Sequence, residues 1–362
     1  YGTGNRGSEY DWQQFLADNP GSNLTYNEYA KQYSYNYVNG TGGGVNENAQ
    51  PWGPRFDAGL LLDQWIKGPN SPYVSNPDNI KDNYFQTGKN IINQVAVTAK
   101  GTDAFGRLAF SNRKMDGIFF NTDQTVNTIN GSVTLKPNNG KLTVGSNFNF
   151  VQRKSDNIPV VSYGTMTDMA WGAFRLIPLD EVKKVYEEHG NEMGSGYNPN
   201  ANNYFYNLTN TNSMERNRFF GTVNFNYEIK DWLSVSSIVG MDYYNELRKQ
   251  ITHSRTRANI NNKRGGQFSQ SDQTVQEFNA DARLNFNKQI SDNFSLQGLV
   301  GGNFRQNRYN SMTLSASDLT VPDLFTISNF KGTPGTGMFE STREMISLYS
   351  SASLGYKQYL FL

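Results

Sequence analysis

The sequence has no cysteine and only two histidines among its 362 residues. Without cysteine, disulfide bonds, thiolate metal sites and cysteine nucleophiles are excluded. His189 and His253 fall in different predicted loops, so the sequence supports neither a histidine metal site nor a Ser-His-Asp arrangement. Glycine-rich stretches at residues 2–7 and 40–44 lack the flanking strand or the lysine of nucleotide-binding loops. We therefore expect no catalytic residue, no metal, no cofactor and no enzymatic activity.

Charge and long hydrophobic runs are also scarce. Only 18% of the residues are charged and the net charge is +1, so the sequence predicts no nucleic-acid partner. No run approaches the roughly 18 to 20 apolar residues of a membrane-spanning helix. The first residues lack the basic start and apolar centre of a signal peptide. We expect the chain to follow a removed signal or to be an internal piece of a longer protein.

What the sequence does contain is a repeated alternation of apolar and polar residues. Near the stretch KPNNGKLTVGSNFNF, Leu142, Val144 and Phe148 alternate with Asn147 and Asn149. Side chains of a strand point to opposite faces in turn, so this pattern predicts one apolar face and one polar face. The pattern recurs in paired segments at residues 94–113, 124–153, 218–244, 275–308 and from 344 onward. The sequence therefore predicts a series of long antiparallel hairpins.

The connections between these strands are short and long in turn. Residues 91–362 predict about ten strand passes, with long loops near residues 154–214, 246–273 and 310–342. Residues 1–90 are rich in Gly, Asn, Pro and Tyr, and they predict a long extracellular loop region before the first strand. Short helices are expected at residues 13–17, 27–32 and 180–189.

The length of the strands favours one of two all-β architectures. Strands of soluble sheets average about five or six residues, whereas a tilted membrane-spanning strand needs about nine to eleven, with apolar residues outward. We therefore predict a transmembrane antiparallel β-barrel with long extracellular loops and short periplasmic turns, and a soluble β-solenoid or sandwich is the alternative. Nine polar residues are predicted to face the lumen: Asn147, Asn149, Asn224, Asn226, Asp281, Arg283, Asn285, Asn303 and Arg305.

Aromatic residues of the loops are the candidate substrate contacts. Aromatic rings stack on sugar faces or grip peptide side chains, and neighbouring amides supply hydrogen bonds. The candidates are Trp52, Trp65, Tyr73, Trp171, Tyr204 and Tyr206. Each of them could instead hold its loop together or contact a partner protein.

Four stretches resemble the SusC/RagA family of TonB-linked outer-membrane transporters. They are PWGPRFDAG (51–59), NPDNIKDNYFQTGKNIINQVAVTAKG (76–101), RLAFSNRKMDGIFFNTD (107–123) and SLYSSASLGYKQYLFL (347–362). The resemblance implies a 22-stranded barrel in the bacterial outer membrane, filled by an N-terminal plug. It also implies import of oligosaccharides, peptides or similar large nutrients, a SusD-like surface lipoprotein as partner, and energy from TonB-ExbB-ExbD.

The chain departs from the family pattern because its sequence shows no plug and only about ten strand passes. We therefore expect it to form one long outer loop region and the first half of a barrel wall in the lipid bilayer. TonB-ExbB-ExbD would then act through an N-terminal part outside this sequence. The alternative is a structural or client barrel captured in a larger outer-membrane assembly.

Overall fold

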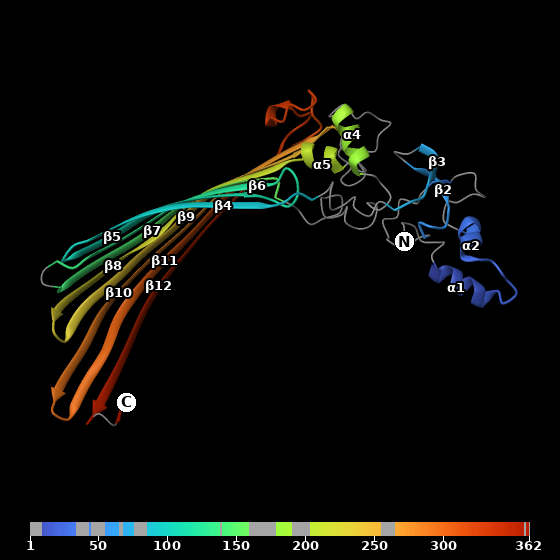
Figure 1. The fold of residues 1–362 in the computed structure, drawn as a ribbon. Coiled ribbons are helices and arrows are strands. Elements are labelled where there is room, and N and C mark those ends of the chain that lie inside the picture. The colour runs from blue at the N-terminus through green and yellow to red at the C-terminus, as the bar shows by residue number, and fades with distance from the viewer. Residues whose placement is uncertain are drawn as a thin grey trace.

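The chain is dominated by one antiparallel sheet of ten strands (Figure 1). The computed structural model describes residues 9–33, 43–44, 55–64, 68–75, 85–137, 140–158, 179–189, 203–254, 265–357 and 360–361. Each strand of the large sheet pairs with the next one in sequence, from β4 at one edge to β13 at the other. The predicted all-β class with consecutive antiparallel hairpins is confirmed.

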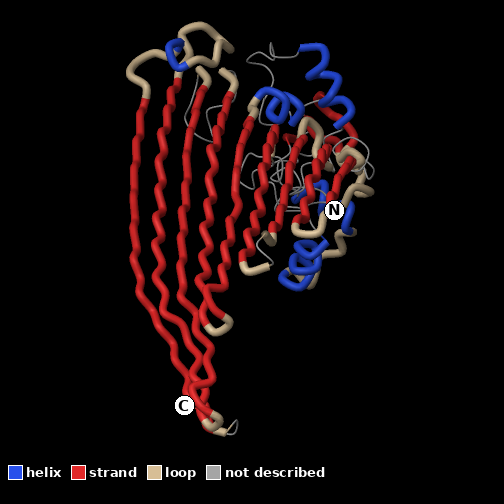
Figure 2. The backbone as a smooth tube through the Cα atoms, turned by 90° about the vertical axis from the view of Figure 1, so that its left-hand side faces the viewer, coloured by secondary structure: helices blue, strands red, loops and turns tan. Residues whose placement is uncertain are grey.

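The strands lengthen from β4 to β10. Their bounds are β4 Lys89–Lys100, β5 Ala104–Asp116, β6 Asp123–Leu135, β7 Leu142–Asp156, β8 Asn212–Lys230, β9 Leu233–Thr252, β10 Gln267–Ser291, β11 Phe294–Ser317, β12 Gly335–Tyr356 and β13 Leu360–Phe361. The connections after β4, β6, β8, β10 and β12 are short and lie at one end of the sheet, which we call the turn end. The connections after β5, β7, β9 and β11 lie at the opposite loop end, and all of them except residues 117–122 are longer (Figure 2).

About half of each of two predicted loops is strand. The loops expected near residues 246–273 and 310–342 shrink to the connections 253–266 and 318–334, because β9 to β12 are 20, 25, 24 and 22 residues long. Toward the loop end both faces of these strands become polar, so the alternation of hydrophobicity fades although the backbone ladder continues. The predicted boundaries were wrong for that reason.

The register defines two faces of the sheet. Directly opposed residues of antiparallel strands share a face, so the pairs Val144↔Phe225 and Leu284↔Val300 belong to one side, which we call the apolar face. Its apolar part forms a band over residues 142–150, 219–227, 233–243, 278–286, 294–304 and 346–356. These segments contain nine or eleven residues each, which is the length that a membrane-spanning strand needs.

Side chains of the apolar band are exposed to an unusual degree. Ile346 and Leu348 of β12 are 77% and 87% exposed, and Val97 of β4, which lies outside the band on the same face, is 69% exposed. Exposed apolar surface of this extent is costly in water, because transferring it to an apolar medium releases about 25 cal/mol for each Å². The band therefore needs an apolar environment to cover it.

Helices gather at the loop end (Figure 1). The predicted helix at residues 180–189 is α4, Leu179–His189, and it is followed by α5, Asn203–Thr209, which the sequence pattern did not predict. Residues 318–334 include the short 3-10 helix η4, Ile327–Asn329. Among the described residues, no helix combines the length and the apolar character that crossing a membrane requires.

The N-terminal part folds around a small core of its own. It contains α1 Glu9–Asp18, α2 Tyr26–Tyr33 and a three-stranded sheet of β1 Gly43–Gly44, β2 Leu61–Gln64 and β3 Gly68–Pro72. Both predicted helical pieces are therefore present. A capping box begins α2, because the Glu28 amide donates to Thr25 Oγ1 and the Thr25 amide donates to the Glu28 carboxylate. Its core cluster contains Tyr26, Ala30, Ala58, Leu60 and Tyr73.

Gly221 of β8 lets neighbouring strands approach closely. A Cβ atom there would overlap the carbonyl oxygen of Asn147 and lie 3.0 Å from Phe148 Cα. We expect Gly221→Ala to lower the free energy of unfolding by about 1 to 3 kcal/mol, because backbone atoms of β7 must shift. Urea unfolding of the full-length protein in detergent micelles measures this cost.

Gly240 of β9 provides the control for this substitution, because a Cβ there meets nothing closer than Thr222 Cγ2 at 3.5 Å. Gly240→Ala should leave the unfolding midpoint nearly unchanged. Equal midpoints for the two variants would contradict the close approach at Gly221.

Candidate functional site: the polar face of the sheet

The nine residues predicted to face a lumen lie on one face of the sheet. The register joins Asn224 to Ile238, Ile238 to Asp281 and Asp281 to Asn303, and it joins Asn226 to Ser236 and Ser236 to Arg283. Asn147 and Asn149 of β7 join this face because Asn147 pairs with Thr222 of β8. Asn285 and Arg305 lie two positions along their strands from Arg283 and Asn303, and therefore share the face. We call this side the polar face. Its exposure to a lumen stays a prediction.

Amides of the polar face bond across neighbouring strands. Asn147 Nδ2 donates to Thr222 Oγ1 at 2.9 Å, and Asn285 Nδ2 donates to Ser236 Oγ at 3.0 Å. Asn149 Oδ1 accepts from Asn130 at 2.7 Å, and Asn303 Nδ2 donates to Asn279 at 2.7 Å. Such cross-strand pairs each contribute a few tenths of a kcal/mol and fix the direction of the side chains. The face is thus an ordered hydrogen-bonding surface.

The predicted charged residues form pairs on this face. Arg305 Nη2 lies 2.9 Å from Glu277 Oε2, and Arg283 Nε lies 3.1 Å from Asp281 Oδ1. The second oxygen of Asp281 accepts a 2.6 Å hydrogen bond from the hydroxyl group of Tyr349. Each of these carboxylates lies within ion-pair distance of a guanidinium group, which lowers the cost of placing charge on a partly buried surface.

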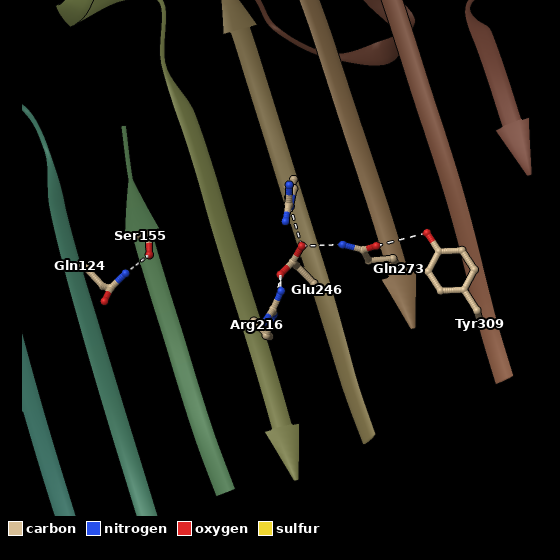
Figure 3. Close-up of polar contacts among 7 residues, drawn as sticks. Gln124, Ser155, Arg216, Glu246, Gln273 and Tyr309 are labelled. Carbon is tan, nitrogen blue, oxygen red and sulfur yellow. Dashed lines mark hydrogen bonds and ion pairs between the residues drawn. The ribbon is translucent and has the colours of Figure 1, made fainter. Parts of the chain in front are cut away.

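Glu246 is the most buried charge of the polar face, with no exposed side-chain surface. Arg216 Nε donates to one carboxylate oxygen at 2.5 Å, while Arg248 Nε and Gln273 Nε2 donate to the other at 2.5 Å each (Figure 3). Gln273 in turn accepts a 3.3 Å hydrogen bond from the Tyr309 hydroxyl group. The Glu246 carboxylate thus links β8, β9 and β10, and Gln273 extends the network to β11.

A second ion pair lies beside this network. Arg218 donates to Asp242 through Nε at 2.9 Å and through Nη2 at 2.5 Å, the two-bond geometry that arginine makes with carboxylates. The guanidinium of Arg216 stacks over the ring of Tyr244, with Cζ 4.7 Å from the centroid. We call the set of Arg216, Arg218, Asp242, Glu246, Arg248, Gln273, Glu277, Arg305 and Tyr309 the charged belt.

Sequence analysis missed most of the charged belt. Glu246, Arg248 and Gln273 lie within the predicted loop at residues 246–273, where charged residues are usually solvated. One sequence pattern could have indicated it. Arg216, Arg218 and Asp242 alternate in step with the polar residues of their strands, so they extend the polar face toward the loop end. A smaller buried polar contact, from Gln124 Nε2 to Ser155 Oγ at 2.9 Å, joins β6 to β7 in the same region (Figure 3).

Tyr73 and Tyr204 are buried. Tyr73 is 1% exposed and stacks on Phe56, with the ring centroids 4.9 Å apart. Tyr204 of α5 is 6% exposed and stacks on Phe120 at 4.9 Å. Burial raises the pKa of Tyr204 to about 12, and the negative charges of Asp180 and Glu187 act in the same direction. Both rings stabilise loops, and their contact with substrate stays a prediction.

The other aromatic candidates cannot be placed. Trp52, Trp65 and Trp171 lie outside the described residues, as does the side chain of Tyr206.

His253, Ser254 and Asp323 meet at the loop end. His253 Nε2 lies 2.9 Å from Asp323 Oδ1, and Ser254 Oγ donates to the same oxygen at 3.0 Å. In a catalytic triad the histidine stands between the serine and the carboxylate, so that it can take the serine proton. Here the carboxylate stands between the other two groups, and the contact joins the end of β9 to the connection that follows β11. The geometry of the three residues is that of a polar contact that holds these two connections together.

Comparison with known proteins defines the class of this fold. No family model matches the sequence, and no curated protein matches it. Solved structures of the RagAB peptide importer match with TM-scores of 0.60 in the "closed-closed" state and 0.58 in the "open-open" state, each at 12% identity. The "RagAB peptide transporter" matches at 0.57 with 10% identity.

These matches cover 78% of this chain and 31 to 32% of the importer chain, so the sequence spans about a third of that length. The sheet therefore has the fold of part of the RagAB importer chain. The predicted resemblance to SusC/RagA proteins is confirmed at the level of the fold.

Glu246 should contribute more to stability than any partly exposed carboxylate of the charged belt. We expect Glu246→Gln to lower the free energy of unfolding by about 1 to 3 kcal/mol, because two arginines lose their shared anionic partner in a buried position. Thermal or urea unfolding of the full-length protein in micelles measures the loss.

Glu277→Gln is the matched control, since Glu277 is 41% exposed and its pair with Arg305 is open to solvent. This change should cost about 0 to 1 kcal/mol. A larger loss for Glu277→Gln than for Glu246→Gln would show that burial does not set the strength of these pairs.

Proposed function

We propose that this chain forms part of the wall of a TonB-dependent import channel in the bacterial outer membrane. One observation carries the proposal: a sheet with the fold of the RagAB barrel has an exposed apolar band of membrane-spanning height on one face and ordered polar groups on the other. A barrel wall in lipid has this combination, because its outer surface meets hydrocarbon and its inner surface meets water.

The proposed orientation in the membrane follows from the chemistry of the two faces and from the lengths of the connections at the two ends of the sheet. The apolar band faces lipid, and the polar face lines the lumen or contacts the plug that the family resemblance implies. Short turns of such barrels are periplasmic and long connections are extracellular, so α4, α5 and residues 318–334 lie outside the cell. The charged belt then lies on the extracellular side of the lumen wall.

The imported substrate is a peptide, an oligosaccharide or a nutrient of similar size. The resemblance to SusC/RagA proteins supports this range, together with a SusD-like lipoprotein over the extracellular opening and energy from TonB-ExbB-ExbD. Amides and paired charges of the polar face offer donors and acceptors to either substrate class. The wall supplies passage and binding, and no chemical step is assigned to it.

Arginine substitutions on neighbouring residues of β8 test which face meets lipid. Val223 lies in the middle of the apolar segment 219–227 and is 49% exposed, while Asn224 is exposed on the polar face. Val223→Arg should destabilise the barrel by about 2 to 4 kcal/mol, because a charge enters the middle of the hydrocarbon layer. Asn224→Arg should be tolerated. Heat-modifiable mobility of the full-length protein from outer membranes reports assembly, and equal assembly of the two variants would contradict the orientation.

Uptake by cells tests the import function. Deletion of the full-length gene in its own bacterium should abolish uptake of either fluorescent peptides or fluorescent oligosaccharides. Wild-type protein and the Asn224→Arg variant should restore it, whereas Val223→Arg should not, because too little barrel assembles. Unchanged uptake of both substrate classes in the deletion strain would refute the proposal.

A further inference from the structure

Two lysines converge on one indole ring at the turn end of the sheet. Trp232 lies in the turn between β8 and β9, and its ring has Lys230 Nζ at 5.6 Å and Lys288 Nζ at 4.7 Å from the centroid. Lys230 ends β8, while Lys288 comes from β10, on the other side of β9. The amide of Asn287 donates to the carbonyl oxygen of Trp232 at 2.9 Å and ties the turn to β10.

Both lysines lie at the margin of the apolar band that is nearest the turn end. Leu233 pairs with Lys230 on one side and with Phe286 on the other, so Lys230 belongs to the apolar face. Lys288 lies two positions beyond Phe286 and therefore points to the same face. The apolar surface ends here and is followed at once by two positive charges beside a half-buried ring.

Acidic groups of the described residues leave both ammonium groups available. Asp231 occupies the same turn and Glu228 lies near the end of β8, yet neither Lys230 nor Lys288 forms an ion pair with a described carboxylate. Both lysines are exposed, while Trp232 is half-buried. The ring holds the two cations near each other by cation–π attraction, although like charges repel. An anion between them would relieve that repulsion.

A similar unit stands on the neighbouring hairpins. Lys357 Nζ lies 5.4 Å from the ring centroid of Tyr356, and Tyr356 packs on Phe294 at 5.0 Å. Phe294 and Tyr356 are register partners at the turn end of the apolar face. The amide of Lys357 donates to the carbonyl oxygen of Asn293 at 2.8 Å, which fixes the turn. The pairing of lysine with an aromatic ring is thus repeated along this margin.

We propose that Lys230, Trp232 and Lys288 form a binding site for the headgroup phosphate of an anionic phospholipid in the leaflet next to the short turns. The ammonium groups bind phosphate oxygens, and the indole lies at the depth where ring and headgroup region meet. Phosphatidylglycerol fits best, because its headgroup adds no cation to compete with the lysines. The site rests on the proposed membrane orientation, in which the apolar band lies in lipid.

Native mass spectrometry of the full-length protein in detergent tests the site with phosphatidylglycerol, phosphatidylcholine and inorganic phosphate as separate additions. The wild-type protein should retain phosphatidylglycerol in preference to phosphatidylcholine, and free phosphate should not replace the lipid. Lys230→Gln together with Lys288→Gln should weaken phosphatidylglycerol binding by roughly fivefold for each lysine. Arginine at both positions should keep the preference, because the charge is retained.

Lys183→Gln together with Lys184→Gln is the control pair, since both lysines are exposed on α4 at the opposite end of the sheet. This variant should bind phosphatidylglycerol as the wild type does. Folded protein that binds both lipids equally, with no effect of the Lys230 and Lys288 changes, would overturn the headgroup site and leave the barrel orientation intact. Folded protein that retains neither lipid would overturn both.

Discussion

The antiparallel register between β4 and β12 is the constraint on which the rest of the structure depends. Because the side-chain period of a strand is two, a slip of one residue in any pair would move a whole strand's apolar residues to the polar face. The observed ladders avoid this over nine consecutive strands, with breaks only next to the turns at Glu228/Lys230 and Gln289/Ser291. One continuous apolar band and one continuous polar face result.

Polar groups of the inner surface reinforce that register. Most of the charged pairs and amide pairs span two neighbouring strands, and the carboxylate of Glu246 alone accepts from donors on three strands. A slipped strand would leave Glu246 buried without its donors, at a cost of several kcal/mol. The charged belt thus gives the long strands a specific alignment in the region where the apolar band no longer distinguishes the two faces.

Sequence alone predicted the part of the fold in which the two faces differ chemically. Alternation of apolar and polar residues, as at Leu142, Val144 and Phe148, predicted the strands, the turns between them and the face that the nine polar residues share. It could not predict the loop-end halves of β9 to β12, because polar residues such as Asn245 and Asp272 occupy the side of the apolar face there, opposite the residues of the polar face. Glu246 was missed for the same reason, since a carboxylate in a predicted loop carries no sign of burial.

Helix α5 and the aromatic candidates show a different limit. The seven residues of α5 are too few for a helical period to be recognised, and tertiary contacts hold the element in place, such as Phe205 against the ring of His253 at 5.2 Å. Tyr204 is an aromatic residue of the kind that often contacts ligands, but its ring is packed on Phe120. Whether a loop aromatic is exposed or buried depends on contacts with residues far away in sequence, which alternation does not encode.

Most of the strand length outside the apolar band lies at the loop end of the sheet. In β10, residues 278–286 belong to the apolar band, whereas residues 267–277 continue for about 35 Å beyond it toward the loop end. Lysine and aromatic residues close the band at the other margin, only a few residues from the turns. On the proposed orientation, the wall therefore projects far outside the membrane and barely beyond it on the periplasmic side. On the same orientation, the charged belt lies between the loop end and the depth of the bilayer, and its residues belong to strands.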